Sequence, residues 1–342
     1  MKKYKLICVI IFLLILLSIV LATFIGSADI KFAQVIDIYK FKLHFSNTDL
    51  DDMGLYSIIW NIRLPRAIVA VLVGGGLALT GCIMQALTGN VMAEPYTLGI
   101  QSGAGMFAAF SIAFFSQIPI LGILGTNILA FIGAMISMIF VYIISSRDKA
   151  KSNSNLILIG ISISMLCNAI IQLIIAFAPD NAKIRSIVFW TMGGLGGAHW
   201  EDISLLFIVS IIGFIITYAL AEELNIISMG EETAIILGVQ LHKLNKILLV
   251  CVSVMVGAIV SISGSIGFVG LITPHIVRKI VGSDHKKLIP VATLTGALFL
   301  VWTDIVSRVI VAPKELPIGV ITSLIGVPFF LFIIKKRSRG VK

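Results

Sequence analysis

Asp304 and Arg308 stand four residues apart inside an otherwise apolar segment of this chain of 342 residues. On a helix, that spacing places both side chains on one face, where they can form an ion pair. Buried ionisable groups are expensive in a membrane, and rows of them carry protons or ions across it. Residues 67–93 and 247–277 contain no Asp, Glu, Lys or Arg. The sequence therefore shows no proton relay and favours a structural ion pair between Asp304 and Arg308.

Common catalytic motifs are absent from the sequence. It contains no G-x-S-x-G nucleophile motif, no H-E-x-x-H metal motif and no G-x-x-x-x-G-K-[ST] nucleotide-binding loop. The four cysteines lie far apart in apolar stretches and are expected to be buried thiols: Cys8, Cys82, Cys167 and Cys251. We expect no catalytic residue, metal ligand or cofactor in this chain. If ATP drives its function, a separate chain must hydrolyse it.

The composition indicates a membrane protein. Hydrophobic residues make up 58% of the chain and charged residues 13%, whereas soluble proteins contain about 45–50% apolar residues. Apolar runs of roughly 20 residues, the length that a helix needs to cross the hydrocarbon core, recur along the sequence. They lack the period-two alternation of barrel strands. Because backbone groups in lipid must be paired internally, we predict an all-α integral membrane protein.

About ten transmembrane helices are predicted, in a single permease-like domain that covers residues 1–342. The predicted spans are residues 6–26, 66–88, 96–115, 118–144, 155–178, 203–221, 246–265, 268–281, 288–310 and 318–334. With both termini in the cytoplasm, the inner segments hold most of the 26 Lys and Arg residues, as the positive-inside rule requires. The same rule explains the net charge of +9 without a nucleic-acid partner. The first apolar run is too long for a typical signal peptide, so we expect a multi-pass protein of the cytoplasmic membrane.

Residues 222–245, between the sixth and seventh spans, form the cytoplasmic segment richest in carboxylates. Glu231 and Glu232 begin a short helical pattern that Gly238 can end. Ala234 and Leu237 are expected on one face of this helix. A short amphipathic helix in the cytoplasm suits docking into a groove of a partner protein. The pattern alone is equally compatible with an ordinary solvated loop.

The second and seventh spans share a glycine-rich pattern. The segments "VGGGLALTG" at 73–81 and "VGAIVSISG" at 256–264 both read V-G-x-x-[LV]-[AS]-[LI]-[TS]-G. The two spans are predicted to run in opposite directions, as in transporters built from inverted repeats. Close packing of helices through small residues explains the pattern equally simply.

Three longer segments resemble a known family. They read "RLPRAIVAVLVGGGLALTGCIMQALTGNVMAEPYTLGIQSGAG", "GFVGLITPHIVRKIVGSDHKKLIP" and "ELPIGVITSLIGVPFF". In order and spacing they are similar to the signatures of the FecCD family, the permeases of type II ABC importers for iron-siderophores, haem and cobalamin. One difference is the segment 90–95, which reads N-V-M-A-E-P where the family commonly has N-P-L-A-[DE]-P.

The resemblance implies an assembly of several chains. A second permease, identical or homologous, completes the pathway at the permease interface. Two cytoplasmic ATPase subunits bind ATP and Mg, and an extracytoplasmic binding protein delivers the substrate. In the family, the loop before the seventh span docks on the ATPases. The matching positions here are Gly230, Glu231, Glu232, Ala234, Leu237 and Gly238.

The resemblance also implies a docking site for the binding protein on the outer face. Arg63 and Arg66 match family arginines that pair with carboxylates of the binding protein, and Arg308 aligns with another such position. Anchoring of the second span is the alternative role for Arg63 and Arg66. For Arg308 the alternative is the structural pair with Asp304.

A third set of positions is expected near the pathway or its gate. Pro274, His275 and Arg278 match the family pattern P-H-x-x-R, and the fixed φ of Pro274 is expected to start a helix there. We expect His275 to be a packed or gate-side residue. Helix packing is the alternative for the whole set, which comprises Gln85, Asn90, Gly99, Pro274 and His275.

The resemblance thus implies a permease that imports a ferric siderophore or related iron chelate, driven by ATP hydrolysis in partner subunits. Haem or cobalamin is the alternative substrate within the family. An ion-coupled secondary transporter is the alternative from another class, against which the lack of buried carboxylates argues. A membrane enzyme is the least favoured. The sequence does not distinguish a homodimer of permeases from a heterodimer.

Overall fold

The computed structural model describes residues 2–26, 30, 32–42, 53–115, 123–146 and 153–339, and within these ranges it is helical without strands. The ten predicted spans each coincide with a helix. These are α1 (Lys2–Phe24), α4 (Leu64–Thr88), α5 (Ile100–Phe114), α6 (Ile123–Ser146), α7 (Asn153–Ala176), α9 (Trp200–Ala219), α12 (Leu241–Ser263), α13 (Val269–Val281), α14 (His285–Val309) and α15 (Ile318–Arg339). Within the described ranges, 7 helices are long and apolar enough to cross a membrane. The apolar helices Ile100–Phe114 and Ile318–Ile333 are shorter, and α13 has 13 residues.

Several short helices connect the spans. At the start of the chain, α2 (Phe32–Lys42) is followed by α3 (Met53–Tyr56) and the π-helix η1 (Ser57–Arg63), which continues into α4. The 3₁₀-helix η2 (Pro95–Leu98) precedes α5, and α8 (Asn181–Met192) precedes α9. Two further helices, α10 (Ala221–Ile227) and α11 (Glu231–Ile236), lie between α9 and α12.

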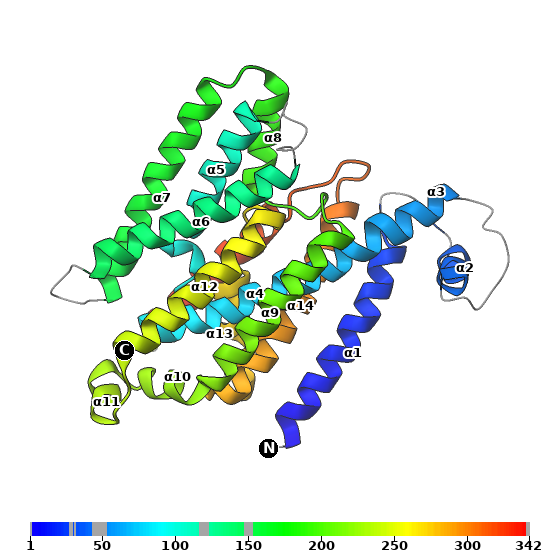
Figure 1. The fold of residues 1–342 in the computed structure, drawn as a ribbon. Coiled ribbons are helices and arrows are strands. Elements are labelled where there is room, and N and C mark those ends of the chain that lie inside the picture. The colour runs from blue at the N-terminus through cyan, green and yellow to red at the C-terminus, as the bar shows by residue number, and fades with distance from the viewer. Residues whose placement is uncertain are drawn as a thin grey trace.

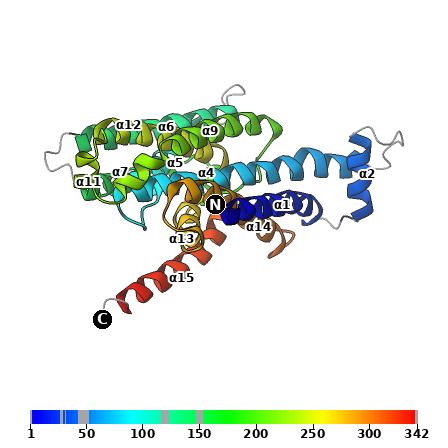
Figure 2. The ribbon, with the colours of Figure 1, turned by 90° about the horizontal axis from the view of Figure 1, so that it is seen from below.

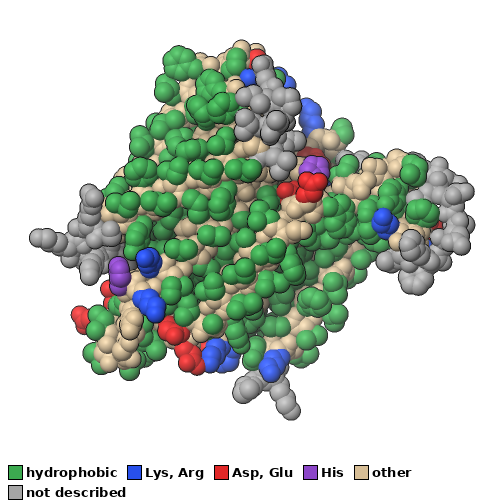
Figure 3. Space-filling model, in the orientation of Figure 1, with side chains coloured by type: hydrophobic (Ala, Val, Ile, Leu, Met, Phe, Trp, Pro, Cys, Tyr) green, Lys and Arg blue, Asp and Glu red, His purple; other side chains and the backbone are tan. Residues whose placement is uncertain are grey.

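The helix α4 occupies the centre of the bundle and contacts α9, α12, α13 and α14. Glycines permit these close approaches. A Cβ atom at Gly81 would lie 1.9 Å from the carbonyl oxygen of Gly270, and one at Gly74 would lie 2.3 Å from that of Gly296. In the helix that contains α4, 83% of the 18-residue apolar window is buried within the protein, whereas in α9 the corresponding share is 17%. Helices such as α9 therefore present apolar side chains to lipid, and Figure 3 shows hydrophobic side chains over this face of the molecule.

The two segments with the shared glycine-rich pattern lie in α4 and α12, which contact each other. The two helices run in opposite directions through the bundle (Figure 1), as the predicted topology requires. Their contacts fit the packing role of small residues. Descent of α4 and α12 from an inverted repeat stays a prediction.

The ends of the bundle are distinct (Figures 1 and 2). Both chain ends lie at the same end of the bundle as α10 and α11, and the opposite end carries α2, α3 and α8. This arrangement agrees with cytoplasmic termini and a cytoplasmic segment at 222–245. The predicted inner segments include the basic residues of 147–152 and the last three residues of the chain, and these lie outside the described residues.

Candidate functional site

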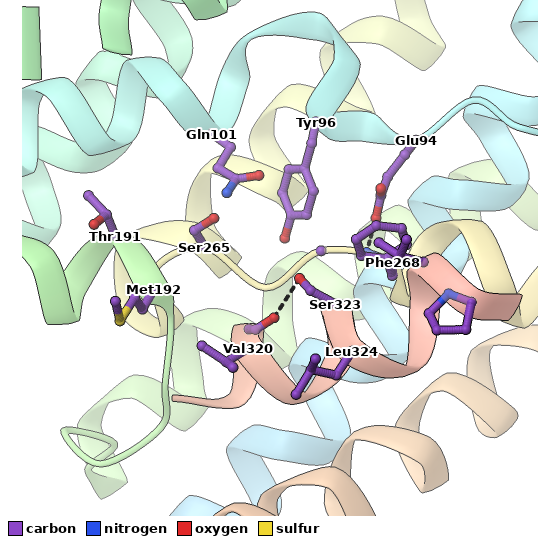
Figure 4. Close-up of a pocket in the computed structure, with 14 residues that line it drawn as sticks. Glu94, Tyr96, Gln101, Thr191, Met192, Ser265, Phe268, Val320, Ser323 and Leu324 are labelled. Atoms are coloured by element: carbon purple, nitrogen blue, oxygen red, sulfur yellow. Dashed lines mark hydrogen bonds between the residues drawn. The ribbon is translucent and has the colours of Figure 1, made fainter. Parts of the chain in front are cut away.

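A cavity of about 770 Å³ lies between η2, α5, α8, α15 and the linker that joins α12 to α13 (Figure 4). Apart from Glu94, its polar side chains are neutral: Tyr96, Gln101, Thr191, Ser265 and Ser323. Its apolar lining comes mainly from Met192, Phe268, Val320, Leu324, Val327 and Pro328. The described residues contain no group of His, Cys, Asp or Glu arranged to hold a metal ion. The lining offers a large solute weak polar and apolar contacts and supplies no ligand set for a bare metal.

Phe268 forms one wall of this cavity, immediately before α13. Its backbone adopts a φ of 68°, a left-handed value that is uncommon for a residue with a side chain. The backbone N–H of Phe268 donates a hydrogen bond to the Glu94 carboxylate, and the Tyr96 hydroxyl donates to the carbonyl oxygen of Ile266. A Cβ atom at Gly326 would lie 2.3 Å from the Phe268 ring. The linker is therefore held between η2 and α15, and the ring has little room to move.

None of the five predicted pathway residues lines this cavity. Asn90 shapes the turn after α4, because its side-chain oxygen accepts a hydrogen bond from the backbone N–H of Met92 at 3.0 Å. Gly99 has a φ of 75°, and a Cβ atom there would lie 3.1 Å from the carbonyl oxygen of Gly160 in α7. Turn geometry and helix packing explain both residues.

Gln85 joins α4 to α13 inside the bundle. It is 3% exposed, donates to the carbonyl oxygen of Leu271 at 3.3 Å and accepts from the Arg278 guanidinium at 3.0 Å. Gln85 therefore satisfies polar groups of α13 at a helix contact, and Arg278 has a partner within the chain.

Pro274 and His275 lie inside α13. The expected helix start at Pro274 is wrong, because α13 begins at Val269 and Pro274 is buried within it. His275 is half-buried and meets the ring of Phe329 in α15 edge to face, with 6.3 Å between ring centroids. The sequence predicted a packed or gate-side histidine, and this ring contact fits the packed role.

The three outer-face arginines are buried. Arg66 is 5% exposed; it donates to Asp304 at 2.8 Å and to Glu315 at 2.8 Å. Arg308 is 3% exposed, and its guanidinium lies 3.1 Å from the second oxygen of Asp304. Two arginines thus share one buried carboxylate, and the structural pair predicted for Arg308 and Asp304 is present.

Arg63 and Arg308 also fasten the end of α1 to the bundle. Arg63 is 5% exposed and donates to the carbonyl oxygens of Thr23 and Phe24 at 3.0 and 2.8 Å. Arg308 donates to the carbonyl oxygen of Ala22 at 3.0 Å. These contacts hold α1, α4 and α14 together and fit the alternative roles, anchoring of the second span for Arg63 and Arg66 and the structural pair for Arg308. Direct contact of Arg63, Arg66 or Arg308 with a binding protein stays a prediction that this geometry does not support.

The predicted docking segment forms a helix pair, α10 and α11. As expected, α11 begins at Glu231 and ends before Gly238, which adopts a φ of 81° where a side chain would be strained. The backbone N–H of Gly238 donates to the carbonyl oxygen of Ile235 at 3.0 Å. Gly230, on the other side of the helix, has a φ of 116°. Glycines thus permit the sharp turns at both ends of α11.

One face of the helix pair packs against the bundle, and the other face, called the open face below, is exposed. Ala234 is fully buried and packs into the core cluster of the bundle, so it does not share a face with Leu237, contrary to expectation. The open face carries exposed apolar side chains that the sequence analysis missed, and these are Met229, Ile235 and Ile236, next to Leu237. Glu231 and Glu232 are also exposed. An exposed apolar surface with two carboxylates beside it, outside the spans, is suited to protein contact.

Comparison with known proteins is consistent with these features. The FecCD transport family matches residues 13–336. The hemin transport system permease protein of Yersinia pestis is 38% identical over 296 residues, 85% of this chain and 86% of that protein. The cobalamin import system permease protein of Halobacterium salinarum is 38% identical over 281 residues, 82% of this chain and 74% of that protein. A solved inward-facing structure described as a metal-chelate type ABC transporter has a TM-score of 0.82 and 29% identity, covering 97% of this chain and 99% of the other.

Proposed function

The chain belongs to the FecCD transport family of ABC importer permeases, and we propose that it carries a ferric chelate, such as a siderophore complex, across the cytoplasmic membrane. The observation that carries this proposal is the cavity of about 770 Å³ with its mostly neutral lining and single carboxylate. Its size is in the range of cavities that hold a sizeable organic ligand. Because a translocation path must release its cargo, weak contacts with the ligand are preferable to tight coordination.

A chelate fits this lining better than a bare metal ion. Metal ions are held by converging His, Cys, Asp or Glu side chains, and the described part of the chain has no such group. In a chelate, the organic ligand already satisfies the metal, so the permease meets an organic surface. The similarity to a hemin permease and to a metal-chelate transporter supports this class of cargo.

Haem and cobalamin are the second candidates. Permeases named for hemin and for cobalamin are each 38% identical to this chain. A path without metal ligands is compatible with either molecule. An ion-coupled secondary transporter is not favoured, because Asp304 inside α14 is already paired with Arg66 and Arg308 and the Glu94 carboxylate already accepts a hydrogen bond from the backbone of Phe268.

We further propose that the open face of α10 and α11 binds an ABC ATPase. Four apolar side chains on this face are 58–84% exposed, and they are Met229, Ile235, Ile236 and Leu237. The helices α10 and α11 lie at the same end of the bundle as the two chain ends (Figure 1), which we infer to be the cytoplasmic end. ATP and Mg would bind to the ATPase, and movement of the docked helices would drive alternating access.

A second permease subunit is proposed to lie along α15. This helix carries large apolar side chains that the chain leaves exposed, with Leu324 at 68%, Leu331 at 60% and Phe332 at 64%. It also contributes Val320 and Leu324 to the cavity. A partner subunit on α15 would therefore close the cavity and place it at an interface. A binding protein is proposed to dock at the outer end of the bundle, which carries α2, α3 and α8 and lies opposite α10 and α11.

Uptake in cells tests this proposal. Cells with and without the gene would be given radioactive iron as ferric siderophores, haem or free salt, and labelled cobalamin in parallel. Loss of uptake of one ferric chelate on deletion, restored by the gene, supports the proposal. Loss of cobalamin uptake with unchanged iron uptake would identify cobalamin, and not a ferric chelate, as the substrate. Unchanged uptake of every compound, in cells without related importers, would contradict the import function.

A further inference from the structure

We propose that Asn225 is a positioning residue that transmits movement of the docking helices to the turn between α13 and α14, and through α13 to the Phe268 wall of the cavity. The inference rests on the proposed function, because it assumes that an ATPase moves α10 and α11. It assigns one side chain of α10 to the link between the ATPase contact and the pathway.

The Asn225 carboxamide spans two helices. Its oxygen accepts hydrogen bonds from the backbone N–H of His285 and from the imidazole Nδ1–H of the same residue, both at 2.8 Å. Its nitrogen donates to Asp284 at 3.1 Å. His285 is 2% exposed, so its two bonds with Asn225 are partly shielded from water, whereas the Asp284 side chain is 37% exposed. Asn225 thus uses both ends of its side chain to hold the first residues of α14.

Asp284 connects Asn225 to the first turn of α14, because its carboxylate accepts hydrogen bonds from both. As the N-cap residue, it accepts a hydrogen bond from the backbone N–H of Lys286 at 3.1 Å, and it pairs with Lys287 at 3.1 Å. Burial opposes ionisation of Asp284, but the hydrogen bonds from Asn225 and its neighbours outweigh that effect and lower its pKa. Asp284 is therefore a carboxylate in the cell, and its bond from Asn225 is charge-assisted.

The helix α13 connects this turn to the cavity. It runs from Val269 to Val281, a length of about 20 Å at the usual helical rise. Phe268 precedes its first residue, and Gly282 follows its last. Pro274 lies in the interior of this helix, and we infer that displacement of the turn at 282–284 passes along α13 to the Phe268 wall.

A second link between α10 and α14 lies at the surface. Lys286 pairs with Glu222 of α10, but both side chains are more than half exposed. Exposed ion pairs contribute little to stability. The bonds between Asn225 and the buried His285 are therefore the stronger connection, and the exposed pair of Glu222 with Lys286 provides a matched control on the same two helices.

The experiment uses the complete importer in liposomes, with its ATPases and binding protein, and measures chelate transported per ATP hydrolysed. For Asn225→Ala, we expect hydrolysis to continue and transport per ATP to fall about fivefold or more, in the usual range of coupling between sites. Glu222→Gln is expected to keep the wild-type ratio. Copurification with the ATPase measures whether the docking surface remains intact, and we expect it to be unchanged in both variants.

Exchanging the side chains of Asn225 and Asp284 distinguishes a loss of coupling between ATP hydrolysis and transport from a simple loss of folding. Asn225→Asp alone places two carboxylates together and is expected to lower the ratio. The double variant Asn225→Asp with Asp284→Asn restores a donor, an acceptor and an N-cap, and is expected to recover most of the wild-type ratio. The proposed role of Asn225 is contradicted if Asn225→Ala keeps the wild-type ratio of chelate transported per ATP hydrolysed. It is also contradicted if the double variant regains wild-type stability without regaining that ratio. Failure of the wild-type importer to transport any chelate would instead contradict the proposed function.

Discussion

The backbone N–H of Phe268 donates a hydrogen bond to the carboxylate of Glu94. This bond joins the loop after α4 to the residue that opens α13, and both partners line the cavity. The left-handed backbone of Phe268 is a strained conformation that persists where its surroundings hold it. The Glu94 carboxylate is one of the groups that hold it.

Glu94→Ala should therefore loosen the wall of the cavity. We expect a loss of about 1 kcal/mol of stability, because a partly buried N–H loses its acceptor, together with altered uptake. Glu94→Gln keeps an acceptor oxygen and should be milder. Thermal unfolding in detergent and chelate uptake measure the two effects. Gln101→Ala, which changes another side chain of the same cavity, is the control for stability, and equal destabilisation by both alanine variants would contradict this role for Glu94.

The exposed face of α11 should bind the ATPase through apolar contacts. Ile236 is 84% exposed, so Ile236→Asp should leave the melting temperature of the isolated permease unchanged. A charge in the centre of a protein interface weakens binding, typically by more than 1 kcal/mol, and copurification of the ATPase should fall. Gln240→Asp adds a charge at an exposed position just beyond α11 and should have little effect. Normal ATPase binding by Ile236→Asp would place the docking surface elsewhere.

Asp304 should be important for folding. Its removal leaves Arg66 and Arg308 without their shared buried carboxylate, and loss of one member of a buried ion pair costs about 3–5 kcal/mol. Asp304→Ala should lower the melting temperature strongly. Glu315→Gln should have a smaller effect, because the Glu315 side chain is 42% exposed. A melting temperature near that of the wild type for Asp304→Ala would show that these arginines are held by other contacts.

The closest helix contacts should not tolerate added atoms. Gly81→Ala would place a methyl group 1.9 Å from the carbonyl oxygen of Gly270, so α4 and α13 must separate. Overpacking of this kind costs about 1–3 kcal/mol. Gly197→Ala is the matched control, because nothing lies within 4 Å of a Cβ atom there. Equal thermal stability of the two variants would contradict the close contact between α4 and α13.

The spans could be predicted from the sequence because lipid imposes one strong constraint, a helix of sufficient apolar length. The same constraint explains why α8 was missed. It has 12 residues and includes Lys183 and Arg185, so it lacks the apolar length of a span. The helix of the docking segment was predictable because Glu231 and Gly238 mark its ends locally.

The cavity and the arginine partners were harder to predict, because they depend on residues that are distant in the sequence. Arg66 and Glu315 meet only when α4 and the segment before α15 come together. Phe268 was predicted as the first residue of the eighth span, whereas the structure places it in the linker before α13. The glycines around it, in "SGSIGF", were the available signal that the chain leaves the helical pattern there.

Transport by the purified importer tests the central claim most directly. The permease would be reconstituted with its ATPases in liposomes that contain ATP and Mg, and its binding protein would be added outside with a radioactive ferric siderophore, haem, cobalamin or free iron salt. We predict ATP-dependent accumulation of a ferric chelate, no accumulation of free iron, and no transport by the permease without its ATPases. Accumulation driven by an ion gradient in the permease alone, or of free iron without a chelator, would contradict the account.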